Sequence, residues 1–275
     1  MKVNSLMIKV FGLQHPHDKV VEIFTRYGDH GKLLDAPSGP GIISQKLKEA
    51  GFDVAAVDID PKMFCVQGIS CEKADLNFDL PISDETFDYI LCSNGIEHLE
   101  NPVNFIRECF RILKEKGKLL ISTPNILNLK SRLANLLVGF NLFTGRPNNE
   151  VDDFLGGEHI HLANYYELRT HLHRNGFRIL EVTTHCYSHR AMLFAPLYLI
   201  VYLATWRAFR RERNLRQQER NREILKHVLS ADLILGKKLF LMAVKDPQYI
   251  RSGETSSPPP SASRGERKGE GCHSL

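Results

Sequence analysis

Apolar and polar residues alternate along the chain in two distinct patterns. Helical spacing of apolar residues, three and four apart, predicts helices over His17 to Tyr27, Ile42 to Ala50 and Val103 to Leu113. Short apolar runs bounded by turn residues predict buried strands over Lys32 to Ala36, Phe52 to Val57, Cys71 to Ala74, Phe87 to Cys92, Gly117 to Ser122, Phe177 to Val182 and Leu239 to Val244. Strands that alternate with helices favour a mostly parallel sheet with both faces covered. We therefore predict an α/β fold with a seven-stranded, Rossmann-like sheet.

The second half of the chain adds helices before the last predicted strand. Apolar residues from Leu129 to Phe140 recur at helical spacing, and Asn164 with Glu167 forms a capping-box pattern at the start of another helix. We expect residues 1–190 and 237–246 to form the sheet domain and residues 191–236 to form a helical insertion. Residues 247–275 include three consecutive prolines among serine, glycine and charged residues, which predicts a disordered tail.

A loop after the first predicted strand suggests a nucleotide site. An apolar pair leads into Asp35, then into a turn that contains Gly39 and Gly41, and then into a helix. The backbone amides of such a turn and helix N-terminus favour anionic ligands. Asp58 follows the second predicted strand, where a carboxylate can accept hydrogen bonds from ribose hydroxyls. Together these residues predict a ligand that contains adenosine.

Composition and cysteine spacing indicate how large a core the chain can form and in which cellular compartment it works. A chain of 275 residues with 43% apolar and 25% charged residues can bury one full core. Its six cysteines show no paired spacing typical of zinc sites or disulfide frameworks, which favours a reducing compartment. The first residues lack the apolar run of a signal peptide. We therefore expect a cytoplasmic location, with peripheral attachment to a membrane as a further possibility raised by the insertion.

Five motifs occur in an order that resembles a known family. They are LLDAPSGPG, VAAVDID, ADL, FDYILCSNGIEHLENP and GKLLISTPN, which together cover Leu33 to Asn125, and GGEHIHLANYYELRTHLHRNGFRILEV extends the likeness to Val182. The chain resembles the class I S-adenosylmethionine-dependent methyltransferases, in the small-molecule branch related to quinone-biosynthesis enzymes. The resemblance implies S-adenosyl-L-methionine as cofactor and methyl transfer as the reaction.

The resemblance also implies roles for individual residues. Asp35 would anchor the loop under the methionine part of the cofactor, Asp58 would hold the ribose diol, and Ile59 would pack on the adenine. The remaining cofactor-binding positions that it implies are Ala36, Ser38, Gly39 and Gly41 in the loop, Asp75 and Leu76 beside the adenine, and Asn94 and Gly95 below the methionine. The chain departs from the family at Pro37, which occupies the place of the first glycine, and at Pro40 within the loop. Proline fixes φ and removes an amide donor, so this loop is stiffer than the family pattern.

Methyl transfer is an in-line displacement that depends mainly on alignment of the two reactants. A base is needed only where the acceptor must lose a proton, and His98 and His159 are the candidates for that role. The alternative for each is a histidine hydrogen-bonded for structural reasons. Some quinone O-methyltransferases build a metal site here from two acids and a histidine. Because Asn94 stands where the first acid would be, we predict no metal.

The insertion begins with an apolar segment, Ala191 to Phe209, that could take three forms. It could span a membrane, form a core or cap helix over the substrate pocket, or lie in a membrane interface with its aromatic residues at headgroup depth. It runs directly into a basic stretch that contains Arg207, Arg210, Arg211, Arg213, Arg216, Arg220, Arg222 and Lys226. The interfacial form predicts an anionic membrane as a partner through residues 191–226 and a lipid-like acceptor. Aromatic residues are not interleaved after Phe209, which disfavours nucleic acid.

Three classes of function therefore remain open from the sequence. The leading one is transfer of a methyl group from S-adenosylmethionine to a small or lipid-like acceptor. The second is a protein that keeps this fold without catalysis and acts as a membrane-associated partner, which Pro37 suggests. The third is an NAD-dependent oxidoreductase, since a glycine loop and an acid after the second strand also serve that cofactor.

Overall fold

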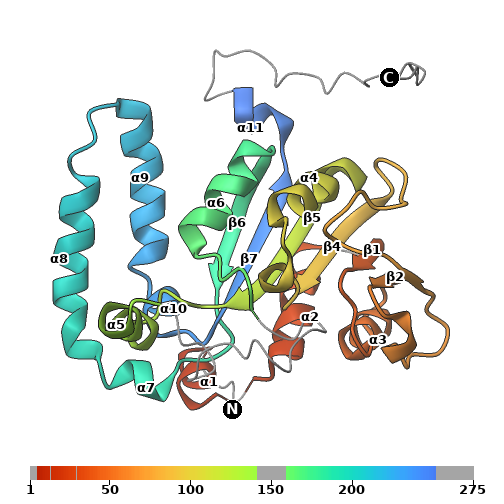
Figure 1. Cartoon of the computed structure of the whole chain (residues 1–275), viewed down its shortest axis with the longest axis horizontal. Coiled ribbons are helices and arrows are strands. Elements are labelled where there is room, and N and C mark those ends of the chain that lie inside the picture. Colours follow the sequence, from red (N-terminus) through yellow and green to blue (C-terminus); the bar gives the residue numbers. More distant parts are fainter. Residues whose placement is uncertain (1–4, 13, 29, 141–158, 252–275) are drawn as a thin grey trace, which may run out of the picture.

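A seven-stranded sheet forms the centre of the computed structural model, which describes residues 5–12, 14–28, 30–140 and 159–251 (Figure 1). Its strands are β1 (Lys32–Asp35), β2 (Asp53–Asp58), β3 (Cys71–Lys73), β4 (Phe87–Ser93), β5 (Leu113–Pro124), β6 (Phe177–Thr183) and β7 (Lys238–Lys245). They are ordered β3-β2-β1-β4-β5-β7-β6, and β7 alone runs antiparallel to its two neighbours, β5 and β6. The predicted α/β fold with a mostly parallel sheet is confirmed.

Helices cover both faces of the sheet because its central strands are apolar on both sides. On one face, α2 and α3 pack on Leu33, Leu91 and Leu120. On the other face, α4, α6 and α9 pack on Leu34, Ile90 and Ile121. The helices are α1 (Ser5–Phe11), α2 (Pro16–Tyr27), α3 (Ile42–Glu49), α4 (Pro102–Ile112), α5 (Leu129–Val138), α6 (Tyr165–Arg174), α7 (His189–Met192), α8 (Tyr198–Phe209), α9 (Leu215–Val228), α10 (Ala231–Leu235) and α11 (Pro247–Arg251).

The strand order reverses next to β1, and we call the region between the loops that follow β1 and β4 the crevice. After β1 the chain moves to β2 and β3 on one side, whereas β4 returns to the other side of β1. The loops that follow β1 and β4 therefore diverge at the carboxyl ends of these strands. Ligands of open α/β sheets bind at such a point. The 3-10 turns η1 (Pro61–Met63) and η2 (Ile96–His98) follow β2 and β4 on this edge.

The apolar segment of the insertion does not form one continuous helix. The helix breaks after α7, passes through the 3-10 turn η3 (Ala195–Leu197) at Pro196, and resumes as α8. Proline removes the amide that a continuous helix would use. Residues of α8 are exposed or half-buried and none is buried, so the core-helix form of the interpretation is wrong, whereas the cap-helix form stays a prediction. Within the described part of the chain, no helix has the length and apolar character needed to cross a membrane.

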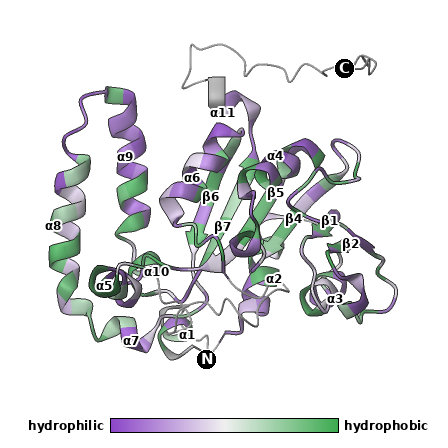
Figure 2. Cartoon of the chain, in the orientation of Figure 1, coloured by the Kyte–Doolittle hydropathy of each residue, from purple (hydrophilic) through white to green (hydrophobic). Residues whose placement is uncertain are grey.

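The two halves of the insertion differ in how they pack. Figure 2 shows apolar residues along much of α8, which stands at the periphery of the molecule beside α9. In contrast, α9 and α10 contribute to the main core through Ile224, Val228 and Leu233. The predicted helical insertion is therefore joined to the sheet through its second half. After β7, residues Pro247 to Arg251 form α11, so this part of the expected disordered tail is helical, and residues 252–275 lie outside the described residues.

Candidate functional site: the crevice beside β1

The loop between β1 and α3 is fixed to the two neighbouring strands by backbone hydrogen bonds. The Ala36 amide donates to the Leu91 carbonyl of β4 at 2.9 Å, and the Ser38 amide donates to the Val57 carbonyl of β2 at 3.0 Å. Both bonds bridge the place where the strand order reverses. The loop therefore lies across the mouth of the crevice in one defined conformation, which includes a cis peptide between Ala36 and Pro37.

Two glycines in this loop are required for different reasons. Gly39 has φ of +51°, and a Cβ built on it would meet no heavy atom within 4 Å, so open space lies over its backbone. Gly41 has φ of +85° and begins α3, and a Cβ there would lie 2.6 Å from the side chains of Phe64 and Val66. Only glycine tolerates that combination of conformation and crowding. The loop thus offers a ligand direct access to backbone at Gly39.

Pro37 is accommodated by a glycine on the opposite side of the crevice. A Cβ on Gly95 would overlap the ring carbons of Pro37, so the ring packs directly against the backbone after β4. The proline therefore ties the first loop to the second. Its ring occupies space that Gly95 provides, and Gly39 remains open.

Asp58 joins the loop to the end of β2. Its Oδ2 accepts a hydrogen bond from the Gly39 amide at 2.8 Å, and its Oδ1 accepts one from the Asp60 amide at 3.0 Å. The residue is 8% exposed. A carboxylate oxygen can accept more than one hydrogen bond. Asp58 can therefore hold the loop in place and still accept hydrogen bonds from a hydroxyl-bearing ligand.

Asp35 lies beneath the loop at the end of β1. Its Oδ2 accepts a hydrogen bond from the Ser44 hydroxyl at 2.6 Å, whereas its Oδ1 has no partner among the described residues. Burial raises the pKa of Asp35 to about 7, and the nearby charge of Asp58 acts in the same direction. A buried carboxyl group with one unused oxygen is unusual in a folded protein and is typical of functional sites.

The residues predicted beside the adenine lie at the ends of β2 and β3. Ile59 is 60% exposed directly after β2, so its apolar side chain is available to a planar ligand. Asp75 accepts two hydrogen bonds from Asn77, at 2.9 and 3.0 Å, which orient its carboxylate. The side chain of Leu76 is buried in the core. Any contact of Leu76 with an adenine would therefore come from its backbone and not from its side chain.

Asn94 and a lysine that the sequence analysis missed lie at the end of β4. Asn94 has φ of +51°, and its side-chain oxygen accepts a hydrogen bond from Lys238 Nζ at 2.5 Å. Burial lowers the pKa of Lys238, and Glu97 opposes that shift. Lys238 is the first residue of β7, and its one visible signal is a lysine pair directly before the apolar run Leu239 to Val244. The insertion of β7 between β5 and β6 brings it to the crevice.

An acid and two histidines meet directly after Gly95. His98 and His159 are 61 positions apart in the sequence, and their ring centroids lie 4.9 Å apart. The ligand-type atoms of Glu97, His98 and His159 all lie within 4.8 Å of one another. Glu97 is 1% exposed, burial raises its pKa, and its Oε2 has no partner among the described residues. The structure thus brings together the two histidines that the sequence offered separately as bases.

This acid–histidine cluster has two possible chemical uses. The two imidazoles can take up a proton beside a carboxylate, or the three groups can hold a divalent cation, with His159 in place of the acid that Asn94 does not supply. The absence of a metal therefore stays a prediction. The amide of His161 donates to the Glu97 carbonyl at 3.0 Å, which holds the second histidine segment against the first.

These observations fit S-adenosylmethionine along the crevice. Asp58 and Ile59 stand where a ribose and an adenine would lie, and the open backbone at Gly39 faces the same edge. Asn94 and Lys238 supply polar groups at the other end. The positive charge of Lys238 suits the carboxylate of a methionine moiety. The unused oxygen of Asp35 lies below the loop between these two ends.

Comparison with known proteins identifies the family. A family model for the methyltransferase domain matches residues 12–182. A ubiquinone biosynthesis O-methyltransferase of Coxiella burnetii is 29% identical over 167 residues, which cover 58% of this chain and 68% of the relative. One from Xanthomonas oryzae is 30% identical over 103 residues, which cover 34% of this chain and 43% of the relative.

Solved structures share the fold at low sequence identity. A SAM-dependent methyltransferase from Archaeoglobus fulgidus has a TM-score of 0.52 and 19% identity, over 83% of this chain and 94% of that chain. A SAM-dependent methyltransferase from Thermotoga maritima has a TM-score of 0.51 and 15% identity, over 84% and 89% of the two chains. The chain belongs to the methyltransferase-domain family, as a class I methyltransferase that uses S-adenosylmethionine.

Proposed function

We propose that the protein methylates a hydroxyl oxygen of a lipid-like acceptor that it takes from an anionic membrane surface. The observation that carries the proposal is the cluster of Glu97, His98 and His159 directly after Gly95. It places proton-accepting groups beside the residues assigned to the methionine end of the cofactor. S-adenosylmethionine, when bound, supplies a methyl group activated on a sulfonium.

The cluster suits an acceptor that must lose a proton. A hydroxyl oxygen becomes a stronger nucleophile when a positioned base removes its proton, and a neutral imidazole can accept that proton. The buried carboxylate of Glu97 would stabilise the imidazolium that results. A protonated amine or a carbon acceptor would also have to lose a proton, so the cluster by itself does not select the acceptor atom. The O-methyltransferase names of the curated relatives support oxygen as that atom.

The surface around α8 supports a lipid-like acceptor. Leu199, Ile200 and Leu203 are 63%, 65% and 52% exposed on this helix. A second set of exposed apolar side chains, Leu136 and Leu137, lies on α5, which packs against α7 at the base of α8. Figure 2 shows both apolar regions at the same end of the molecule. Basic residues follow directly at Arg207, Arg210, Arg211 and Arg213, as expected for a helix that binds an interface of acidic lipids.

The acceptor is tested by methyl transfer from S-adenosylmethionine labelled with tritium in the methyl group. The full chain is incubated with fractionated lipid and aqueous extracts, and label is expected in an O-methyl ether of the lipid fraction. His98→Asn and His159→Asn are then compared with His171→Asn, a change of the same kind on α6. We expect at least one of the first two to lower kcat by about 10²–10⁴-fold without loss of cofactor binding. Label only in aqueous products, or full activity in both variants, contradicts the proposal.

A further inference from the structure

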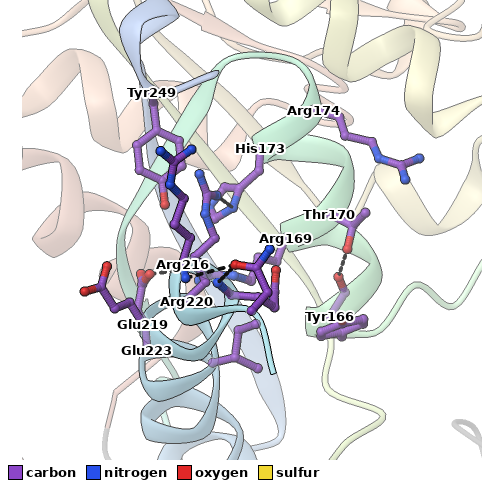
Figure 3. Close-up of a pocket in the computed structure, with 13 residues that line it drawn as sticks. Tyr166, Arg169, Thr170, His173, Arg174, Arg216, Glu219, Arg220, Glu223 and Tyr249 are labelled. Carbon is purple, nitrogen blue, oxygen red and sulfur yellow. Dashed lines mark hydrogen bonds and ion pairs between the residues drawn. The ribbon is translucent and has the colours of Figure 1, made fainter. Parts of the chain in front are cut away.

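A second cleft lies outside the crevice. It has a volume of about 890 Å³ and is lined by α6, by α9 with its capping residue Asn214, and by Tyr249 of α11 (Figure 3). None of its lining residues belongs to the cofactor loop or to the acid–histidine cluster. The volume falls in the range of pockets that bind small molecules. Methyl transfer as described above does not use this cleft.

The floor of the cleft is formed by a buried, paired arginine. Arg169 is 3% exposed, and its Nη2 forms an ion pair with Glu223 Oε2 at 2.7 Å. Its Nη1 donates to the Tyr165 hydroxyl at 3.0 Å. Buried arginines that are paired in this way hold their neighbours in place and carry no free charge. Arg169 and Glu223 thus join α6 to α9 below the opening.

Two arginines lie above this floor. Arg216 and Arg220 stand one turn apart on α9, and within the described ranges neither forms an ion pair. Like charges at this spacing on a helix repel each other. Glu219 is the one other acidic side chain that lines the cleft besides the paired Glu223, among the described residues. The cleft therefore concentrates positive potential that an anion would neutralise.

One of the two guanidinium groups is held in a fixed position. The Arg220 guanidinium carbon lies 4.7 Å from the centroid of the Tyr249 ring, and Arg220 Nη1 lies 3.4 Å from His173 Nδ1. Burial and the nearby charges of Arg169 and Arg220 lower the pKa of His173 to about 3. His173 is therefore neutral and can accept a hydrogen bond from Arg220. Figure 3 shows Arg216 and Arg220 between Tyr249 and Arg169, whereas Arg174 extends to one side.

We propose that this cleft binds a phosphate group, with Arg216 and Arg220 as its main ligands. Guanidinium groups match phosphate oxygens through paired hydrogen bonds, and a stacked, pre-positioned arginine loses little freedom on binding. Tyr166, which is 48% exposed, adds an aromatic surface at the rim for the remainder of the ligand. The phosphate can belong to the headgroup of an anionic lipid or to a free phosphorylated metabolite. Both sources present the same chemistry to the two arginines.

The test is calorimetric titration of the full chain at low salt with two probes. Inorganic pyrophosphate represents a free phosphorylated ligand, and a short-chain phosphatidylglycerol below its micelle concentration represents a lipid headgroup. We expect saturable binding of at least one probe, weakened about tenfold or more in Arg216→Gln and in Arg220→Gln. Tighter binding of pyrophosphate indicates a free ligand, and tighter binding of the lipid indicates a headgroup.

The matched control is Arg222→Gln, which removes the same charge from an exposed position of α9 that does not line this cleft. It is expected to bind both probes as the unchanged protein does. Absence of saturable binding with both probes overturns the proposal, and so does an equal loss in Arg222→Gln. Titration of the same variants with S-adenosylhomocysteine is expected to be unchanged. The result is therefore independent of the proposed methyl acceptor.

Discussion

At the scale of single residues, Asp58 connects the cofactor loop with β2 through one carboxylate. Its two oxygens accept the amides of Gly39 and Asp60. Asp58→Ala is expected to weaken S-adenosylhomocysteine binding about 10–100-fold, because hydrogen bonds to a charged group contribute about 1.5–3 kcal/mol. Calorimetric titration measures the loss. Asp53→Ala, at an exposed position that begins the same strand, is expected to bind normally, and equal affinity of both variants would exclude a role for Asp58 in binding.

Asp35 makes stability depend on pH. Because burial raises its pKa to about 7 from 3.8, the folded protein retains a proton between these pH values that the unfolded chain releases. The free energy of unfolding therefore falls as pH rises through this window, by at most about 4 kcal/mol. Asp35→Asn removes the buried charge, so its melting temperature is expected to exceed that of the unchanged protein more at pH 8 than at pH 5. A difference that does not vary with pH would contradict the raised pKa.

At the scale of elements, the residue pattern predicts those helices and strands whose formation depends on residues close together in the sequence. The run FDYILC predicts β4 because all of its residues except Asp88 are apolar or aromatic, and Asn164 with Glu167 forms the predicted capping box at α6. The residue pattern fails where the burial of a segment depends on which other part of the molecule its apolar residues contact. Ala191 to Phe209 is apolar nearly all round, which is typical of a buried helix, yet the segment breaks at Pro196 and α8 remains exposed. Hydrophobicity alone does not distinguish a helix in a core from one with another apolar partner.

The exposed face of α8 makes membrane binding testable by two substitutions. Leu199→Asn combined with Leu203→Asn removes apolar surface from positions that are 63% and 52% exposed, so folding is expected to be unaffected. Sedimentation with vesicles rich in phosphatidylglycerol is expected to recover the unchanged protein and at most about a tenth as much of the double variant, since each buried leucine contributes about 1.5–3 kcal/mol and about 1.4 kcal/mol is a factor of ten.

The control is Leu215→Asn, which makes the same change at a leucine that is 76% exposed at the start of α9. It is expected to bind vesicles as the unchanged protein does. Retention of the double variant on the vesicles, or failure of the unchanged protein to bind at low salt, would show that α8 does not contact lipid. Binding should weaken as salt rises, because part of it depends on arginines at the surface.

At the scale of the whole molecule, topology assembles the parts of the site that sequence pattern could not combine. His98 follows β4 and His159 precedes α6, so their contact depends on where α6 packs and not on local spacing. Lys238 reaches Asn94 only because β7 is antiparallel and lies beside β5. The motif order predicted Asp35, Asp58 and Asn94 because these positions lie at, or directly after, the carboxyl ends of strands in the parallel half of the sheet. Residues supplied by the antiparallel strand carry no comparable motif.

Topology also decides which half of the insertion belongs to the folding unit, and one matched pair of substitutions measures this. Ile224 on α9 is 3% exposed and packs into the main core, whereas Ile200 on α8 is 65% exposed. Ile224→Ala is expected to lower the free energy of unfolding by about 2–5 kcal/mol, because it leaves a cavity in the core. Ile200→Ala should change it by less than about 0.5 kcal/mol. Denaturant unfolding followed by circular dichroism supplies both values. A small effect of Ile224→Ala would mean that α9 folds independently of the sheet.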